Sequence, residues 1–141
     1  MKKIIIFCVC IVVLIAVLII GNLKDTTIAT GTLVDNGETE VTIKITRTNF
    51  DKLFNRISKE ITVEGDDIQY RYVSNDNNAR KYDGIYNVYI YAVRNGDPLL
   101  GLLFFDKDMQ NIVIHTSCED IYSADEEFIE MADWGKLRSE N

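Results

Sequence analysis

The chain opens with an unbroken run of apolar residues and then changes to shorter segments in which apolar and polar residues alternate. The run covers residues 4–20, with Lys2 and Lys3 before it and Lys24 after it. A helix of this length rises about 26 Å, close to the roughly 30 Å hydrocarbon thickness of a bilayer. The run contains no charged side chain, which favours insertion into lipid. The pattern therefore predicts a membrane-spanning helix.

Two kinds of N-terminal segment share this pattern, a retained anchor and a cleaved signal peptide. Secretory signal peptides have a shorter apolar core of about 7–15 residues, followed closely by a small-x-small cleavage site. The first such site, Ala-Thr-Gly at residues 29–31, lies well beyond the end of the run. We therefore expect residues 1–23 to be an N-terminal membrane anchor, with cleavage and secretion as the alternative. Because two lysines precede the run, the positive-inside rule places the N-terminus in the cytoplasm.

Residues 24–141 are expected to form a single extracytoplasmic domain that is mainly β. A first strand is expected at residues 27–34, and residues 41–46 alternate between apolar and polar positions. The two segments flank an Asp-Asn-Gly turn, the pattern of a hairpin. The segment 99–105 is apolar throughout, which is typical of a strand covered on both faces. Alternation or short apolar runs predict further strands at 61–63, 68–73, 85–94 and 112–117.

The sequence also predicts two helices. The first has an apolar face with helical spacing, formed by Phe50, Leu53, Phe54 and Ile57. Thr48 and Asp51 have the spacing of a capping box at its start, and we expect this amphipathic helix to pack on the sheet. A short C-terminal helix is expected from Ser123 to Trp134, with Gly135 as its stop. The expected fold class is α+β, and its element order is similar to that of a cystatin-like or NTF2-like sheet curved around a helix.

Charge and cysteine content narrow the function classes. Two of the 15 basic residues precede the apolar run, so the exported part carries 13 basic against 22 acidic residues, a formal charge of −9. Such a surface disfavours nucleic acid and anionic lipid as partners. Cys118 is the only cysteine after the run, so no intramolecular disulfide can form there. The sequence contains no Asn-x-Ser/Thr glycosylation site, and together these features favour a bacterial cell envelope.

No catalytic, cofactor or metal motif stands out. His115 is the only histidine, and strand alternation turns it away from its immediate neighbours, so we expect a structural side chain. One histidine and one exported cysteine are too few for a conventional zinc site. The acidic residues between 119 and 130 are expected to form a solvated face, and the segment 106–111 a hairpin turn. We therefore expect no cofactor and no enzymatic activity, with a carboxylate-dependent hydrolase as the last-ranked alternative.

Tyrosines give the clearest indication of a binding surface. Tyr70 and Tyr72 share one face of a predicted strand, and Tyr89 and Tyr91 share a face of the next, beside Asn87. If the two strands pair, these side chains are expected to form one exposed aromatic patch, a surface that anchors protein or carbohydrate partners. The alternative is that the tyrosines stabilise the sheet as cross-strand pairs.

The segment between the two tyrosine strands is a second candidate for contacts. It shows no periodicity and is expected to be an exposed loop of about ten residues. Its candidate contact residues are Asn75, Asp76, Asn77, Asn78, Arg80 and Lys81.

These features favour a membrane-tethered, non-enzymatic recognition module in the bacterial cell envelope. Its expected partners are the cytoplasmic membrane, through the N-terminal helix, and an envelope or extracellular protein. An immunity-type protein that guards the cell against an incoming toxin is one specific version. The first alternative is an extracytoplasmic domain that binds a small ligand or a polymer in a pocket between helix and sheet.

Overall fold

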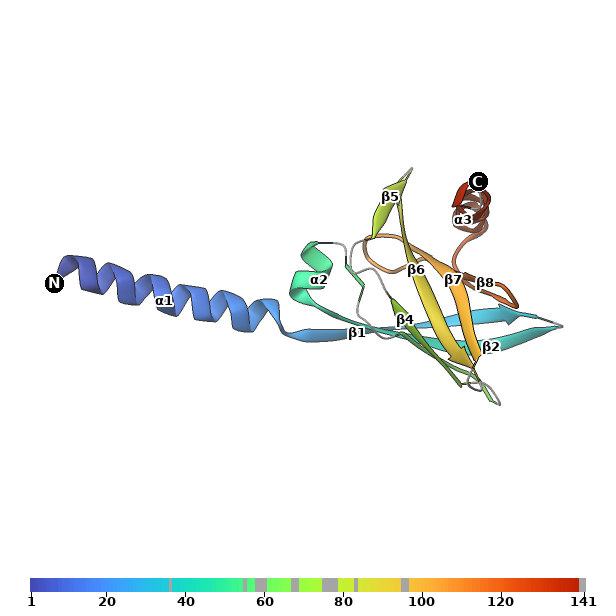
Figure 1. The fold of residues 1–141 in the computed structure, drawn as a ribbon, viewed down its shortest axis with the longest axis horizontal. Coiled ribbons are helices and arrows are strands. Elements are labelled where there is room, and N and C mark those ends of the chain that lie inside the picture. Colours follow the sequence, from blue (N-terminus) through green and yellow to red (C-terminus); the bar gives the residue numbers. More distant parts are fainter. Residues whose placement is uncertain are drawn as a thin grey trace.

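The N-terminal apolar run forms a single helix, α1 (Lys2–Gly21), which extends away from the rest of the molecule (Figure 1). Gly21 is buried, and the preceding residues of the helix are exposed. The helix is long and apolar enough to cross a membrane, a property that signal sequences near an N-terminus share. The expected apolar helix is therefore present.

The computed structural model describes residues 1–35, 37–54, 56–57, 61–66, 69–74, 79–82, 84–94 and 97–139. The elements after α1 are β1 (Lys24–Val34), β2 (Glu38–Thr48), α2 (Asn49–Leu53), β3 (Ile61–Glu64), β4 (Gln69–Ser74), β5 (Arg80–Tyr82), β6 (Ile85–Arg94), β7 (Asp97–Phe105), β8 (Ile112–Thr116), β9 (Asp120–Ser123) and α3 (Glu126–Ser139). The predicted strands are confirmed, and β5 and β9 are additional to them. Of the predicted loop, Asn75, Asp76, Asn77 and Asn78 lie outside the described residues, whereas Arg80 and Lys81 belong to β5.

The antiparallel sheet closes on itself into a barrel. Neighbouring strands follow the order β4-β3-β2-β1-β9-β8-β7-β6-β5, and β4 also pairs with β6. In this closing pair Val73 lies opposite Tyr91, while Lys81 of β5 lies opposite Tyr86 further along β6. Closure pairs the backbone groups that the edges of an open sheet leave unsatisfied. The domain is thus α+β as expected, with a closed antiparallel sheet. The cystatin-like or NTF2-like element order stays a prediction.

The inward-facing side chains of the barrel form the main core. Ile43 and Ile45 of β2 are fully buried, as are Leu103 and Phe105 of β7. They belong to one continuous apolar cluster to which the other long strands also contribute. Burying a side chain of this size contributes about 1.5–3 kcal/mol, so this cluster is the largest stabilising contribution to the domain.

A second apolar cluster lies on the outer face of β7 and β8, under α3. Phe128 and Ala132 of α3 are buried there with Phe104 and Val113. Residues 102–105 of β7 are therefore covered on both faces, as the sequence predicted, whereas Leu100 near the start of the strand is exposed. The predicted helix stop at Gly135 is wrong, because α3 continues to Ser139. Glycine is required at 135 for packing, since a Cβ there would lie 2.6 Å from Phe104 Cε1.

The predicted amphipathic helix is shorter than expected and does not cover the sheet. α2 has the predicted capping box: Thr48 Oγ1 accepts from Asp51 N at 3.1 Å, and Asp51 Oδ2 accepts from Thr48 N at 2.8 Å. Leu53 and Phe54 at its end are 70% and 55% exposed. α2 packs beside the last residue of α1 and next to β2. Ile57, the last residue of the predicted apolar face, is buried in the barrel core, but it lies beyond the end of α2. The expectation that the whole apolar face packs on the sheet is therefore wrong, and α3 covers the outer face of β7 and β8 instead.

Candidate functional site

Side chains from four neighbouring strands lie in one row across the outer face of the barrel. The strand register places Tyr89 opposite Leu102, and Leu102 opposite His115. His115 in turn lies opposite Asp120. Directly opposed residues of antiparallel strands project to the same face, so the row crosses β6, β7, β8 and β9 on the side where α3 packs.

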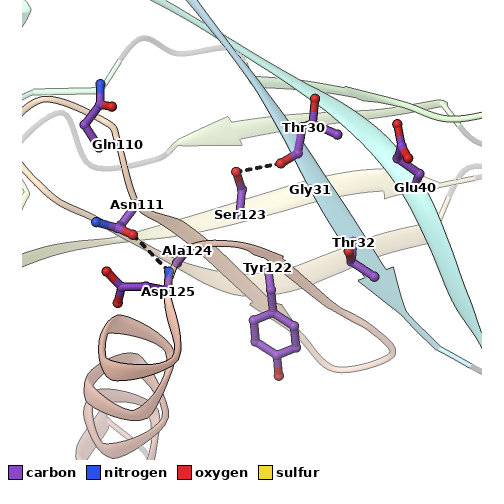
Figure 2. Close-up of a pocket in the computed structure, with 10 residues that line it drawn as sticks. All are labelled: Thr30, Gly31, Thr32, Glu40, Gln110, Asn111, Tyr122, Ser123, Ala124 and Asp125. Atoms are coloured by element: carbon purple, nitrogen blue, oxygen red, sulfur yellow. Dashed lines mark hydrogen bonds between the residues drawn. The ribbon is translucent and has the colours of Figure 1, made fainter.

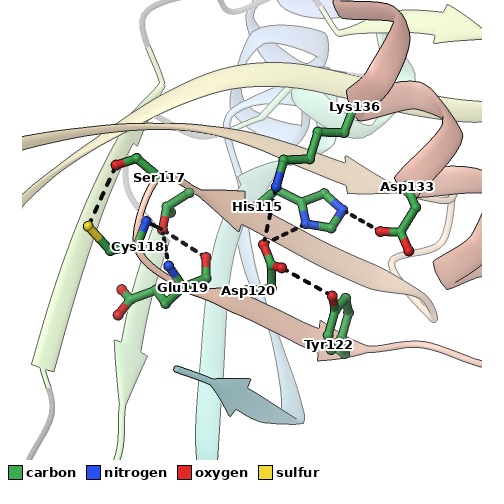
Figure 3. Close-up of polar contacts among 9 residues, drawn as sticks. His115, Ser117, Cys118, Glu119, Asp120, Tyr122, Asp133 and Lys136 are labelled. Atoms are coloured by element: carbon green, nitrogen blue, oxygen red, sulfur yellow. Dashed lines mark hydrogen bonds and ion pairs between the residues drawn. The ribbon is translucent and has the colours of Figure 1, made fainter. Parts of the chain in front are cut away.

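His115 is held between carboxylates from two different elements, as Figure 3 shows. It is only 2% exposed. Nδ1 donates to Oδ1 of Asp120 on β9 at 2.7 Å, and Nε2 lies 3.1 Å from Oδ1 of Asp133 on α3. The second contact has the distance of an ion pair but not the alignment of a hydrogen bond. Through this one ring, β8 is joined both to β9 and to α3.

Further polar and aromatic contacts enclose the His115 ring. The rings of Phe104 and Tyr122 meet it edge-on, with centroid distances of 5.8 and 6.0 Å. The Tyr122 hydroxyl donates to Asp120 Oδ2 at 3.3 Å, and Lys136 Nζ lies 3.7 Å from Asp120 Oδ1. Both ring nitrogens therefore face carboxylates.

This environment changes the acidity of two groups. Burial acts to raise the pKa of Asp120, but the hydrogen bond and charge of His115, together with Lys136, outweigh it and hold that pKa below its usual value. Burial and the negative charge of Asp120 raise the pKa of Tyr122 to about 12. At neutral pH the carboxylate is therefore ionised and the phenol is protonated, which suits the hydrogen bond between them.

We expect Asp120→Asn to lower the free energy of unfolding at neutral pH but to change it little once the pH lies below the lowered folded pKa of Asp120. The lowered pKa means that the folded state favours the ionised carboxylate. Its stabilisation is complete above the ordinary pKa of about 3.9 and is lost as the pH falls through the lower folded value. Urea unfolding of the full-length protein in detergent micelles at several pH values measures this. A difference between wild type and D120N that does not change with pH would contradict the charge interaction.

A groove runs beside the His115 network along the edge of α3, and we refer to it as the α3 groove. Its volume is about 450 Å³. Leu100 and Tyr89 in it are 73% and 44% exposed, whereas Leu102 beneath them is buried. Gly101 allows β7 and β8 to lie close together, because a Cβ at that position would lie 2.5 Å from the carbonyl oxygen of His115. The residues that line it are Tyr89, Leu100, Gly101, Leu102, His115, Thr116, Ser117 and Lys136.

One end of the groove is formed by a tight turn between β8 and β9. Thr116 N donates to Glu119 O at 2.9 Å, and the Thr116 hydroxyl accepts from Glu119 N at 3.0 Å. Glu119 is 3% exposed and accepts from the Tyr72 hydroxyl at 3.4 Å. The turn is therefore fixed from inside the barrel, and it leaves Ser117 and Cys118 exposed at the rim.

Figure 2 shows a second, polar pocket where β1, β9 and the start of α3 meet, with a volume of about 420 Å³. Ser123 Oγ donates to the Thr30 carbonyl at 2.8 Å, and Asp125 N donates to Asn111 Oδ1 at 3.1 Å. These bonds fasten β9 and α3 to the barrel, so we assign the pocket a structural role. It is lined by Thr30, Gly31, Thr32, Glu40, Gln110, Asn111, Tyr122, Ser123, Ala124 and Asp125.

The predicted tyrosine patch is only partly correct. β4 and β6 do pair, but Tyr72 lies opposite Ala92 and is fully buried in the barrel core. The expectation that Tyr72 belongs to one exposed patch is therefore wrong, because the register places it on the opposite face from Tyr91. Tyr89 is exposed, with the Arg80 guanidinium 5.9 Å from its ring centroid. Asn87 and Tyr91, on the same side of β6 as Tyr89, are partly buried, and the side chain of Tyr70 lies outside the described part.

Sequence reasoning missed most of the groove and of the histidine network. Leu100 and Leu102 were not recognised as groove residues, because their strand is apolar on both faces and its sequence pattern marks no exposed position. Asp120 was treated as a member of a solvated acidic face, and Asp133 was not singled out. The i, i+3 spacing of Asp133 and Lys136 is the one local signal that both point to the same side of a helix. Among the described residues, no three histidine, cysteine, aspartate or glutamate side chains are grouped as a metal site requires.

The Asp-rich segment is the turn that the sequence predicted. Asp106 Oδ1 accepts from Gln110 N at 2.8 Å, and Asp106 Oδ2 accepts from Asn111 Nδ2 at 3.0 Å. Met109 adopts a positive φ of 56° in this turn and is buried. The aspartate oxygens thus close the loop between β7 and β8.

Comparisons with known proteins give no family assignment. No family model, no curated protein and no solved structure matches this chain. Function is therefore inferred from the geometry of the chain itself.

Proposed function

We propose that the protein is a membrane-tethered, non-enzymatic recognition module that binds another envelope or extracellular protein through the α3 groove. In this proposal α1 is retained as an anchor in the cytoplasmic membrane of a bacterium, and the barrel faces outward. The observation that carries the proposal is the open groove with exposed Leu100 and Tyr89 side chains on an otherwise rigid surface.

The exposure of the groove favours a protein partner over a small ligand. Small-molecule sites bury most of the ligand surface, about 70–90% of it. Leu100, however, is 73% exposed, so much of this groove opens to solvent. Exposed leucine and tyrosine side chains on a fixed surface are suited to anchor a partner that covers them.

The histidine network supports this proposal by fixing one wall of the groove. Asp133 and Lys136 of α3 both reach the His115–Asp120 pair, at 3.1 and 3.7 Å. A wall that is already ordered loses less conformational entropy when a partner binds. Tethering adds to this, because two proteins that share one membrane meet at a high effective concentration. A modest contact area is therefore sufficient for the proposed function.

The lone cysteine of the exported part tests the anchor and its orientation. Cys118 is exposed, whereas Cys8 and Cys10 lie within α1. We expect a membrane-impermeant maleimide to label the full-length protein on intact cells, and labelling to disappear in Cys118→Ser. The labelled protein should remain in the membrane fraction with the mass of the uncleaved chain. Labelling only after lysis would contradict the orientation, and a shortened chain would contradict the anchor.

A further inference from the structure

The end of the barrel nearest α1 carries exposed apolar side chains. Leu53 and Phe54 are 70% and 55% exposed, and Leu23 between α1 and β1 is 55% exposed. The Phe50 and Phe54 rings stack with a centroid distance of 6.4 Å. Soluble domains rarely gather exposed apolar side chains of this size at one place unless the place is a contact site. We refer to Phe50, Leu53 and Phe54 as the α2 patch.

The α2 patch is fixed directly to the C-terminal end of the apolar helix. Asn49 Nδ2 donates to the Ile20 carbonyl at 2.8 Å, and Asn49 N donates to the Leu23 carbonyl at 3.1 Å. Gly21 allows the close approach, because a Cβ there would lie 2.0 Å from Phe50 Cε2. Figure 1 shows α2 beside the junction of α1 and β1, at the side of the barrel nearest α1. The patch therefore sits where a membrane-spanning α1 leaves the bilayer.

Basic side chains accompany the patch in the arrangement that a bilayer interface favours. The Arg56 guanidinium lies 5.1 Å from the centroid of the Phe54 ring. Lys52 forms an ion pair with Asp25 at the start of β1. At membrane interfaces, apolar and aromatic side chains reach the acyl boundary while arginine and lysine stay at the headgroup level.

We infer that the α2 patch inserts into the outer leaflet beside α1 and so fixes the orientation of the barrel on the membrane. The inference rests on the proposed anchoring by α1. It adds a second lipid contact, which prevents the barrel from rotating freely about the short connection between α1 and β1. The contact is apolar, so the negative charge of the domain does not oppose it on a zwitterionic bilayer.

Tryptophan fluorescence in lipid vesicles tests the inference on the full-length protein. The F54W, W134F variant is reconstituted in phosphatidylcholine vesicles with and without lipids brominated near the headgroup. We expect blue-shifted emission and clear quenching by the brominated lipid. The wild-type protein is the matched control, because Trp134 is 66% exposed on α3 and should be quenched little. The L53W, W134F variant provides a second position in case the first substitution disturbs the Phe50 stack.

Flotation of the same vesicles separates failure of the inference from failure of the anchor. If the protein floats with the vesicles but neither introduced tryptophan is quenched, α1 is an anchor and the α2 patch does not enter the bilayer. If the protein does not float, α1 does not anchor it, and the inference fails together with the proposed tethering. Quenching of both introduced tryptophans above that of Trp134 supports insertion.

Discussion

We expect His115→Ala to lower the free energy of unfolding by about 2–4 kcal/mol, the largest loss from any single change at the site. His115 is buried, and it separates Asp120 from Asp133 with 2.7 and 3.1 Å contacts. Alanine leaves a cavity under α3 and removes the group that both carboxylates face. The contacts of the ring with Phe104 and Tyr122 are lost at the same time. Urea unfolding in detergent micelles measures the change.

Asp133→Asn is the matched control for the histidine substitution. Asp133 is 53% exposed, so solvent screens its charge, and we expect a loss of about 1 kcal/mol or less. The amide also keeps the shape of the side chain. If His115→Ala costs no more than Asp133→Asn, the histidine does not hold α3 on the barrel.

The second large effect is expected in partner binding. Tyr89→Ser and Leu100→Ser together should weaken the affinity for the partner by roughly 100-fold, since an anchor side chain at an interface contributes about 1–2 kcal/mol. Both side chains are exposed, so we expect the free energy of unfolding to change little. The affinity is measured with the partner that copurifies with the full-length membrane protein.

A substitution on another face of the barrel distinguishes specific binding through the α3 groove from nonspecific association of exposed apolar side chains. Ile28 of β1 is 65% exposed and does not line the α3 groove. We expect Ile28→Ser to leave partner affinity unchanged. Equal losses from Ile28→Ser and from the groove variant would show that the α3 groove is not the binding surface.

Local sequence patterns were sufficient to predict the helices and strands, but not the strand pairings that close the barrel. Alternation predicted β2 and β6, and the apolar sequence of β7 correctly indicated cover on both faces over residues 102–105. The pairings of β4 with β6 and of β1 with β9 are long-range, and no local pattern specifies them. The four-residue strand β9 is also too short for a periodic signal.

The two main errors have a common physical origin. Apolar residues at helical spacing indicate a face that avoids water, but the spacing does not show whether every residue of that face reaches the core. Ile57 of the predicted face is buried in the core, whereas Leu53 and Phe54 are exposed. Tyr72 shows the same limit in a strand, because a shift of one residue in register decides whether a side chain points inward or outward.

The contacts of His115 could not all be predicted from the sequence, for a further reason. Asp120 is close to His115 through the turn between β8 and β9, and a hairpin model alone can place the two together. Asp133 reaches the ring only because α3 docks on Phe104, with Gly135 allowing the close approach. The position of that helix depends on tertiary packing, so one of the two carboxylates could not be assigned in advance.

Site-specific photo-cross-linking in native membranes tests the proposed recognition function most directly. A photoreactive amino acid replaces Leu100 in the α3 groove of the full-length protein, or Ile28 on β1 as the control. We predict one discrete protein adduct from position 100, its loss when Tyr89→Ser is added, and no such adduct from position 28. The same adducts from both positions, or an adduct from position 100 that survives Tyr89→Ser unchanged, would contradict recognition through the groove.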